Sequence, residues 1–330
     1  MSLDELRSLI DRHAPRDADA VPAIDGLMLT RAERPTGPRS GIADPVLALV
    51  AQGAKRLTLG GRIYDYEAGQ YLVVSVDLPV SGQCTRAAPD HPFLGFGLRL
   101  RPARLAALLL ESGTGPRTDG TGRRTIGTGT GFSGGRTDPG AAGAVGAGRR
   151  TDLPALAVGA ASADLVGAAA RMVRLLDRPA DIPVLAPMIE REILWRLITG
   201  EQGALVRQIG LADSRLTQIS RAVRFIRDHY TDPLRIEDLA RLAGMSASPF
   251  HRYFRAVTAM TPIQYQKHIR LQEARLRLMS STDDVADVGY AVGYDSASQF
   301  SREYRRQFGR PPGADAARLR NADEEVLAGQ

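Results

Sequence analysis

Two ten-residue stretches of this chain, residues 246–255 and 296–305, share one pattern and lie 50 residues apart. The pattern is Ser-Ala-Ser-x-Phe-x-Arg-x-(Phe/Tyr)-Arg, and a Pro follows each copy at the same distance, at Pro262 and Pro312. An Arg side chain donates two parallel hydrogen bonds to O6 and N7 of guanine, Ser pairs with several bases, and both bind phosphate. The chemistry that these residue types offer is recognition of a nucleic acid.

The elements that must position these side chains are short helices. Each copy follows a Gly and a short amphipathic stretch, with Gly244 after residues 236–242 and Gly293 after residues 285–292. This order is a helix, a Gly turn and a second helix, written twice in tandem. Helices this short are not stable alone, so their aromatic faces are expected to pack against the preceding helices. The predicted inner positions are Phe250, Phe254, Val257, Phe300, Tyr304 and Phe308.

The outer faces of the two second helices are predicted to be polar and basic. Their positions are Ser248, His251, Arg252 and Arg255 in the first helix and Ser298, Ser301, Arg302 and Arg305 in the second, with Glu303 as the acidic exception. Residues 214–320 hold 18 Lys and Arg against 11 Asp and Glu, whereas residues 1–213 are only slightly basic. One Arg on a helix is usually just solvated, but the recurrence of the pattern in the basic part of the chain favours a nucleic-acid surface.

A rigid spacer is predicted between the two copies. Residues 263–279 form one amphipathic helix in this interpretation, which starts after Pro262 at the tolerated first position. Its predicted buried positions are Ile269, Ala274, Leu276 and Leu278. A helix of about 17 residues is about 25 Å long. It would hold the two second helices about one DNA turn apart, near 34 Å.

Residues 214–319 resemble the DNA-binding domain of the AraC/XylS family of bacterial transcription regulators. The resemblance is carried by LARLAGMSASPFHRYFRAVTAMTPIQYQKHIRLQEAR and VGYDSASQFSREYRRQFGRPP. It implies a seven-helix domain whose two second helices enter successive major grooves of double-stranded DNA. The base-reading residues it implies are Ser248, His251, Arg252, Ala297, Ser298, Ser301 and Arg302. The expected phosphate contacts are Arg255, Gln299 and Arg305. RNA polymerase is a further partner if the protein is an activator.

Residues 23–101 predict a small β-barrel or double-sheet roll, so the fold class is α+β. Short runs rich in Val, Leu, Tyr and Phe are separated by turns such as Gly60-Gly61. The predicted strands are 27–32, 46–52, 56–59, 62–66, 71–76, 80–85 and 93–100, and a helix starts at Pro102. This block resembles the cupin-like N-terminal domain of one AraC subfamily, through DPVLALVAQGAKRLTLGGRIYDYEAGQYLVVSVDLPV and APMIEREILWRLITGEQGALVRQI. The resemblance implies binding of a small effector or dimerisation.

The predicted partner of the cupin-like domain is a small organic effector, without a metal or other cofactor. The candidate pocket residues are Tyr66, Tyr71, Ser75 and Arg99. A last strand is predicted at 153–158, and helices at 162–177, 185–199 and 202–211 are expected to supply core and a homodimer surface. Trp195 is interpreted as core rather than as a ligand-stacking residue.

Other classes of function are disfavoured by what the chain lacks. A catalytic metal in a barrel needs two or three His and a carboxylate, yet only His13 and His91 precede residue 151. There is no phosphate loop ending in Gly-Lys-(Ser/Thr), so no enzyme is predicted. An architectural DNA binder is the remaining alternative, and the β domain argues against it because compaction alone needs no pocket. Cys84, the single Cys, is interpreted as a small core residue, with a redox sensor as the alternative.

The composition bounds compartment and domain organisation. The net charge of +6 and the pI of about 9.7 suit a polyanionic partner. The first 20 residues are unlike a signal peptide, and no apolar run reaches the ~18 residues of a membrane span, so a cytoplasmic protein is expected. The Gly-rich segment 112–150 is expected to be disordered, with nonspecific DNA contact as an alternative role. The predicted organisation is 1–22 N-terminal segment, 23–111 cupin-like domain, 112–150 insertion, 151–213 helical part, 214–319 DNA-binding domain and 320–330 tail.

Overall fold

The structure is a computed structural model, and it describes most of the chain outside the Gly-rich insertion. The described residues are 2–15, 23–113, 155–211, 214–280 and 283–318, with the paired dipeptides Arg117–Thr118 (β9) and Arg124–Thr125 (β10). Most of the segment predicted to be disordered, 112–150, and the predicted tail, 320–330, lie outside the described residues.

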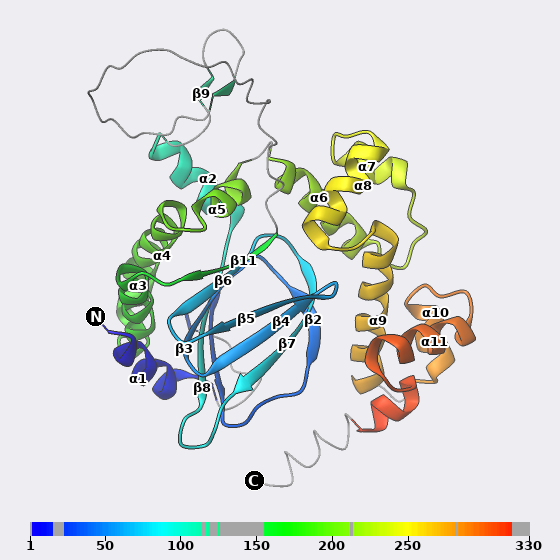
Figure 1. Cartoon of the computed structure of the whole chain (residues 1–330), viewed down its shortest axis with the longest axis horizontal. Helices are drawn as coiled ribbons and strands as arrows, with labels where there is room; N and C mark the ends of the chain where they lie inside the picture. Colours follow the sequence, from blue (N-terminus) through cyan, green and yellow to red (C-terminus); the bar gives the residue numbers. More distant parts are fainter. Residues whose placement is uncertain are drawn as a thin grey trace, which may run out of the picture.

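Two antiparallel sheets that face each other form the N-terminal half (Figure 1). The first sheet has the strand order β1-β8-β3-β6-β11 and the second has the order β2-β7-β4-β5. The strands are β1 (Leu27–Ala32), β2 (Arg39–Ala43), β3 (Val46–Gln52), β4 (Ala54–Leu59), β5 (Arg62–Glu67), β6 (Gln70–Val74), β7 (Leu78–Arg86), β8 (Phe93–Arg99) and β11 (Leu156–Ala160). This is the double-sheet barrel expected from the sequence.

The residues at the turns explain why most of the strands could be predicted from the sequence. One strand, β2, was not predicted. The β4–β5 hairpin turns at Gly60 and Gly61, which have φ values of 52° and 87°. A two-residue type I′ turn needs positive φ at both positions. Strand β2 was not predicted, because its sequence, Arg-Ser-Gly-Ile-Ala, has neither apolar alternation nor a run of β-branched residues.

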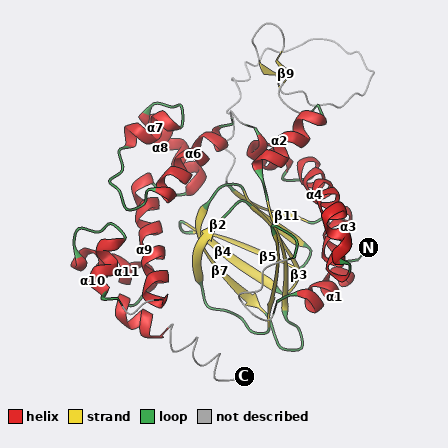
Figure 2. Ribbon diagram, turned by 180° about the vertical axis from the view of Figure 1, so that it is seen from behind, coloured by secondary structure: helices red, strands yellow, loops and turns green. Residues whose placement is uncertain are grey.

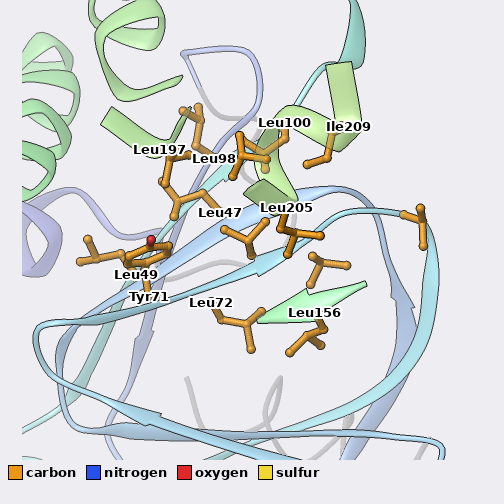
Figure 3. Close-up of a cluster of buried hydrophobic side chains, with 14 of the residues drawn as sticks. Leu47, Leu49, Tyr71, Leu72, Leu98, Leu100, Leu156, Leu197, Leu205 and Ile209 are labelled. Carbon is orange, nitrogen blue, oxygen red and sulfur yellow. The ribbon is translucent and has the colours of Figure 1, made fainter. Parts of the chain in front are cut away.

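Helices cover the outer face of the first sheet (Figure 1). They are α1 (Leu3–His13), α2 (Pro102–Glu111), α3 (Ala163–Arg174), α4 (Ile182–Thr199) and α5 (Gly203–Gly210), with the short 3-10 helices η1 (Leu175–Asp177) and η2 (Pro179–Asp181). In the close-up of Figure 3, Leu47 and Leu98 of the sheet lie with Leu205 of α5 in one apolar cluster. Helix α1, expected in a separate N-terminal segment, packs on α3 and the first sheet and buries Leu6 and Ile10 completely.

The C-terminal part is entirely helical in the described residues. It contains α6 (Arg215–Asp228), α7 (Ile236–Leu242), α8 (Ala247–Thr258), α9 (Pro262–Ser280), α10 (Val285–Ala291) and α11 (Ala297–Phe308), and residues 312–318 are helical as well. Helices α7 and α8 form one helix-turn-helix unit and α10 and α11 form the other. The long helix α9 joins the two units and runs beside the barrel (Figure 2). Helices α8 and α11 begin and end 50 residues apart, so the sequence repeat is a structural repeat.

The aromatic faces of α8 and α11 pack as predicted. Phe250, Phe254, Phe300 and Tyr304 are fully buried, and Phe308 is partly buried with its ring 4.6 Å from that of Tyr304. A Cβ on Gly289 of α10 would lie 2.9 Å from the Phe300 ring, so this Gly permits the close approach of the two helices. Within α9 the prediction was wrong for Leu276, which is 60% exposed. It lies two residues from Ala274 and Leu278, and therefore on the opposite side of the helix.

We expect Phe300→Ala to lower the free energy of unfolding by about 3–5 kcal/mol, because it removes a fully buried ring and leaves a cavity. Phe225→Ala is the matched control, since Phe225 is 37% exposed, and should cost about 1 kcal/mol or less. Urea-induced unfolding followed by circular dichroism measures both changes. Equal losses for the two variants would contradict the helical wheel used here.

Candidate nucleic-acid interface and effector cavity

The outer face of α8 is exposed and basic. Ser248, His251, Arg252 and Arg255 are all exposed. The Arg252 guanidinium lies over the ring of Tyr253, 4.8 Å from its centroid, and donates to the Tyr253 hydroxyl over 3.2 Å. Arg215 of α6 lies over the same ring at 4.3 Å. The aromatic ring therefore gathers two cations beside the exposed face of α8.

The outer face of α11 has smaller side chains. Ser298, Arg302 and Arg305 are exposed, while Ala297 and Ser301 are half-buried. The hydroxyl of Ser296 caps the helix by accepting from the backbone N–H of Gln299 at 3.4 Å. The side-chain amide of Gln299 donates to Glu303 over 3.2 Å. Gln299 is half-buried, like Ala297 and Ser301, and its phosphate contact stays a prediction.

Glu303 does not share the exposed face of α11. It is buried, and its carboxylate accepts from Lys267 at 2.6 Å and from the Tyr294 hydroxyl at 3.0 Å. Burial raises the pKa of Glu303, but the hydrogen bonds that its carboxylate accepts outweigh burial and leave the pKa below its usual value. The acid that broke the sequence pattern is thus a structural anchor to α9. Neither α8 nor α11 presents an acid on its exposed face.

One side chain of α9 ties the two helix-turn-helix units together. Arg270 donates from Nε to the carbonyl of Tyr230 (2.6 Å) and from Nη1 to the carbonyl of Gly293 (2.5 Å). Its Nη2 donates to the carbonyls of Thr231 (3.0 Å) and Asp232 (3.3 Å). Three of these carbonyls belong to the loop before α7 and one to the turn of the second unit. The guanidinium therefore sets the position of one unit relative to the other.

We expect Arg270→Met to lower the free energy of unfolding by about 3 kcal/mol, because four carbonyls lose a charged donor. The control is Arg241→Met, whose ion pair with Asp238 is exposed and should be worth less than about 1 kcal/mol. Urea unfolding of both variants makes the comparison. A loss below about 1 kcal/mol for Arg270→Met would show that water replaces the guanidinium at little cost.

The helical C-terminal half is docked on the barrel through an ion-pair cluster. Arg227 of α6 donates to Asp44 at 3.0 Å and to Asp77 at 3.2 Å. The Tyr265 hydroxyl of α9 donates to the backbone carbonyl of Asp77 over 2.9 Å. Burial is the largest influence on Asp77 and raises the pKa of its carboxyl above the usual value. The contact therefore pairs charged and polar groups of both halves and covers most of the Asp77 side chain.

Two further contacts join the halves. Gln272 of α9 donates its side-chain amide to the carbonyl of Gly41 in β2 over 3.3 Å. At the β4–β5 turn, a Cβ on Gly60 would lie 2.9 Å from the Cβ of Ala259. Ala259 follows α8 with φ of 59°, the left-handed position that Gly309 occupies after α11. The hairpin thus touches the C-terminal end of α8.

We expect Gly60→Ala to loosen this docking, because the added methyl group collides with Ala259. Gly61→Ala is the matched control. It also places Ala at positive φ, but nothing lies within 4 Å of its added Cβ. Hydrogen exchange at the C-terminal amides of α8 should accelerate in Gly60→Ala and remain unchanged in Gly61→Ala. The contact has no role in docking if both variants exchange alike.

A cavity of about 660 Å³ lies between the two sheets, a size suited to a small organic ligand. Its lining includes residues 41–43 of β2 and Asp44, which follows this strand. Strand β2 also contacts α9. Of the predicted pocket residues, Tyr66 and Arg99 line this cavity. Arg99 lies at its exposed edge, in an ion pair with Asp44.

The other two predicted pocket residues do not line this cavity, so the prediction was wrong for them. On β6 the side chains of Leu72 and Val74 line the cavity, and strand alternation turns Tyr71 to the helical side. Figure 3 shows Tyr71 in the apolar cluster below the helices. Ser75 lies just past the end of β6 and donates its hydroxyl to the carbonyl of Ala155 at 2.8 Å.

Sequence reasoning missed Lys55, which lines the cavity. The signal was present, because Lys55 shares the period-two face of β4 with Leu57 and Leu59. Cys84 lies opposite Lys55 on β7 and is buried. Burial raises the pKa of the Cys84 thiol above its usual value, which keeps it from the reactive thiolate form and disfavours the redox-sensor alternative.

Comparison with known proteins identifies the class of protein. The family profile of the AraC-type transcriptional regulator N-terminus matches residues 23–205, more than half of the chain, and a helix-turn-helix domain profile matches residues 239–318. The chain therefore belongs to the family of AraC-type transcriptional regulators. That family consists of transcription regulators and not of enzymes, which confirms the prediction made from the sequence that the protein is not an enzyme. No described helix has the length and apolar character that crossing a membrane would require.

Individual relatives agree with this family. The MmsAB operon regulatory protein of Pseudomonas aeruginosa is 36% identical over 30% of this chain and 32% of its own length. The transcriptional activator RhaS of Citrobacter koseri is 30% identical over 39% of this chain and 45% of its own length. The chain thus spans a third to a half of the length of these curated relatives. The chain is also similar in fold to the crystal structure of an apo ToxT variant from Vibrio cholerae strain SCE256. The TM-score is 0.51 at 8% identity, and the match covers 89% of this chain and 98% of that chain.

Proposed function

We propose that this protein is a sequence-specific, DNA-binding transcription regulator controlled by a small organic effector bound between the two sheets. The observation that carries the proposal is the repeat of α8 and α11. Both helices bury an aromatic face and expose Arg and Ser without an exposed acid. Family membership supports the same function.

The spacing of the two helices fits one face of a DNA duplex. Helix α9 has 19 residues and is therefore about 28 Å long. Successive major grooves on one face of DNA are about 34 Å apart. The proposed base readers are Ser248, His251, Arg252, Ala297, Ser298, Ser301 and Arg302, and the proposed phosphate contacts are Arg255 and Arg305. Because Ala297 and Ser298 are small, α8 carries more of the specificity than α11.

The cavity supports a regulator over an architectural DNA binder. Strand β2 lines the cavity, and its Gly41 carbonyl also accepts a hydrogen bond from Gln272 of α9. Asp44 similarly lines the cavity and accepts from Arg227 of α6. A ligand that moves β2 therefore changes the contacts that dock the DNA-binding half. A protein that only compacts DNA has no use for such a link.

Self-association is part of the proposal. Helix α4 exposes Val184, Leu185 and Met188, and Leu110 of the contacting helix α2 is 77% exposed. Apolar side chains grouped on a helical layer are typical of protein–protein contacts. We infer that these helices form the homodimer surface that was predicted from residues 162–211.

The division of work between Arg residues gives a direct test. Arg252→Ala and Arg302→Ala should each weaken binding to the operator by about 1–3 kcal/mol and relax the preference at one base step. Arg255→Ala and Arg305→Ala should weaken binding to operator and scrambled duplex alike, and lower the salt dependence by about one counterion. The operator is first located by gel shift over the intergenic regions beside the encoding gene. Fluorescence anisotropy at two salt concentrations then measures all four variants.

The outcomes separate base reading from phosphate binding. Equal losses on both duplexes for Arg252→Ala and Arg302→Ala would assign these residues to the backbone and refute the proposed recognition face. Wild-type protein that binds every duplex equally would refute sequence-specific regulation itself. Arg62→Ala is the control for lost charge, because Arg62 lies on β5 of the barrel and is exposed.

A further inference from the structure

Three polar side chains form a row across the floor of the cavity. In the register of the second sheet, Lys55 of β4 pairs with Tyr66 of β5 on one side and with Cys84 of β7 on the other. Directly paired residues of antiparallel strands point to the same face of a sheet. All three residues line the cavity. The sheet thus presents an amine, a phenol and a thiol to the interior of the barrel.

The side-chain ammonium of Lys55 has no ion pair or hydrogen bond with another residue in the described part of the chain. Its side chain runs over Gly82 of β7, where an added Cβ would lie 3.7 Å from the Lys55 Cε. Among the described residues of the cavity lining, Asp44 is the only acid, and it is already paired with Arg99 at 3.3 Å and with Arg227 at 3.0 Å. No carboxylate of the lining therefore remains for the amine.

The neighbours of Lys55 do not supply a negative charge. Burial raises the pKa values of both Cys84 and Tyr66, so the thiol and the phenol stay protonated and neutral. Burial also lowers the pKa of Lys55, because the unpaired ammonium is poorly solvated there. A buried charge without a partner is costly, and an anion that reached it would relieve that cost.

The wall opposite this row is apolar. Leu72 and Val74 of β6 and Phe93 of β8 face the cavity, and Gly95 and Gly97 of β8 leave it without side chains at two further positions. The polar exceptions on this sheet are Thr30 and Arg31 of β1 and Arg99 at the edge, so a sugar or another polyhydroxylated ligand would find few polar partners there. An apolar ligand body would instead bury its surface against it.

We propose that the cavity binds an organic monocarboxylate with an apolar body, whose carboxylate accepts hydrogen bonds from Lys55 and Tyr66. This inference rests on the proposed function, because it names the class of effector that occupies the same cavity. One half-buried cation matches one negative charge. A dianionic phosphate ester would need a second cation at the same depth. Arg39, the other lining cation without an ion pair among the described residues, is exposed at the edge on β2.

The test compares three ligands that share one body and differ in the head group. Isothermal titration calorimetry of the full chain is performed with 4-phenylbutyrate, 4-phenylbutan-1-ol and 4-phenylbutylamine. We expect the carboxylate to bind at least about ten-fold more tightly than the alcohol, since a hydrogen bond to a charged group is worth that factor or more. The amine should bind least, because its charge repels Lys55.

Variants then assign the preference to Lys55. Lys55→Met should abolish the advantage of the carboxylate and leave the affinity for the alcohol unchanged, while Lys55→Arg should retain the advantage. The matched control is Arg56→Met, which removes the adjacent cation of β4; Arg56 does not line the cavity and pairs with Asp65 on β5. Circular dichroism melting of each variant verifies that the barrel is folded. If Lys55→Met does not fold, the comparison of Lys55→Arg with the wild type still tests the role of Lys55.

The inference is overturned if the carboxylate and the alcohol bind equally to the wild type, if neither binds, or if Lys55→Met keeps the ten-fold preference. Its failure is distinguishable from failure of the proposed function. DNA binding by α8 and α11 is measured separately, and a protein that reads its operator but ignores 4-phenylbutyrate refutes only the ligand class. A protein that binds the carboxylate but shows no sequence preference on DNA refutes only the regulator.

Discussion

The placement of both recognition helices depends on one helix, α9, and on the polar side chains that it carries. Arg270 binds carbonyls of both helix-turn-helix units, and Lys267 binds the buried Glu303 of α11. Further along, Arg275 binds the buried Asp315 over 2.9 Å, which also accepts from the Tyr304 hydroxyl. Apolar packing alone permits helices to slide or rotate by small amounts, whereas charged hydrogen bonds require defined geometry. The spacing of α8 and α11, on which reading of two grooves rests, is thus held by directional contacts along one helix.

The same helix connects DNA recognition to the barrel. Tyr265 and Gln272 of α9 reach Asp77 and Gly41, and strand β2, which contains Gly41, lines the cavity. A ligand shifts an equilibrium only by the difference in its affinity for the two states. In our proposal that difference arises at β2, because an occupied and an empty cavity place this short edge strand differently against α9. The turn at Gly60 beside Ala259 adds a second contact near the end of α8.

Buried and half-buried charges in this protein fall into two kinds, and the contrast separates structural roles from ligand binding. Glu303 and Asp315 are buried acids, and each is surrounded by several donors. Such groups are fully satisfied and hold helices together. Lys55 lies in the barrel without a counter-charge among the described residues. A protein gains no stability from an unpaired ammonium in a cavity, so we attribute this residue to ligand binding rather than to folding.

The sequence by itself determined the two helix-turn-helix units, the bounds of β1 and β3, and the burial of Phe250 and Phe300. These features follow from local periodicity and turn chemistry, which act over a few residues. Tertiary structure decided the rest. Periodicity indicates that Leu276 and Leu278 point to different sides of α9, but not which side has neighbours. Periodicity likewise leaves open which face of β6 lines a cavity, so Tyr71 was predicted on the wrong side of the sheet. It also cannot show that Glu303 binds Lys267, or that Lys55 has no acidic partner among the described residues. Each of these depends on contacts between segments far apart in the chain, whose geometry is established only when the elements pack.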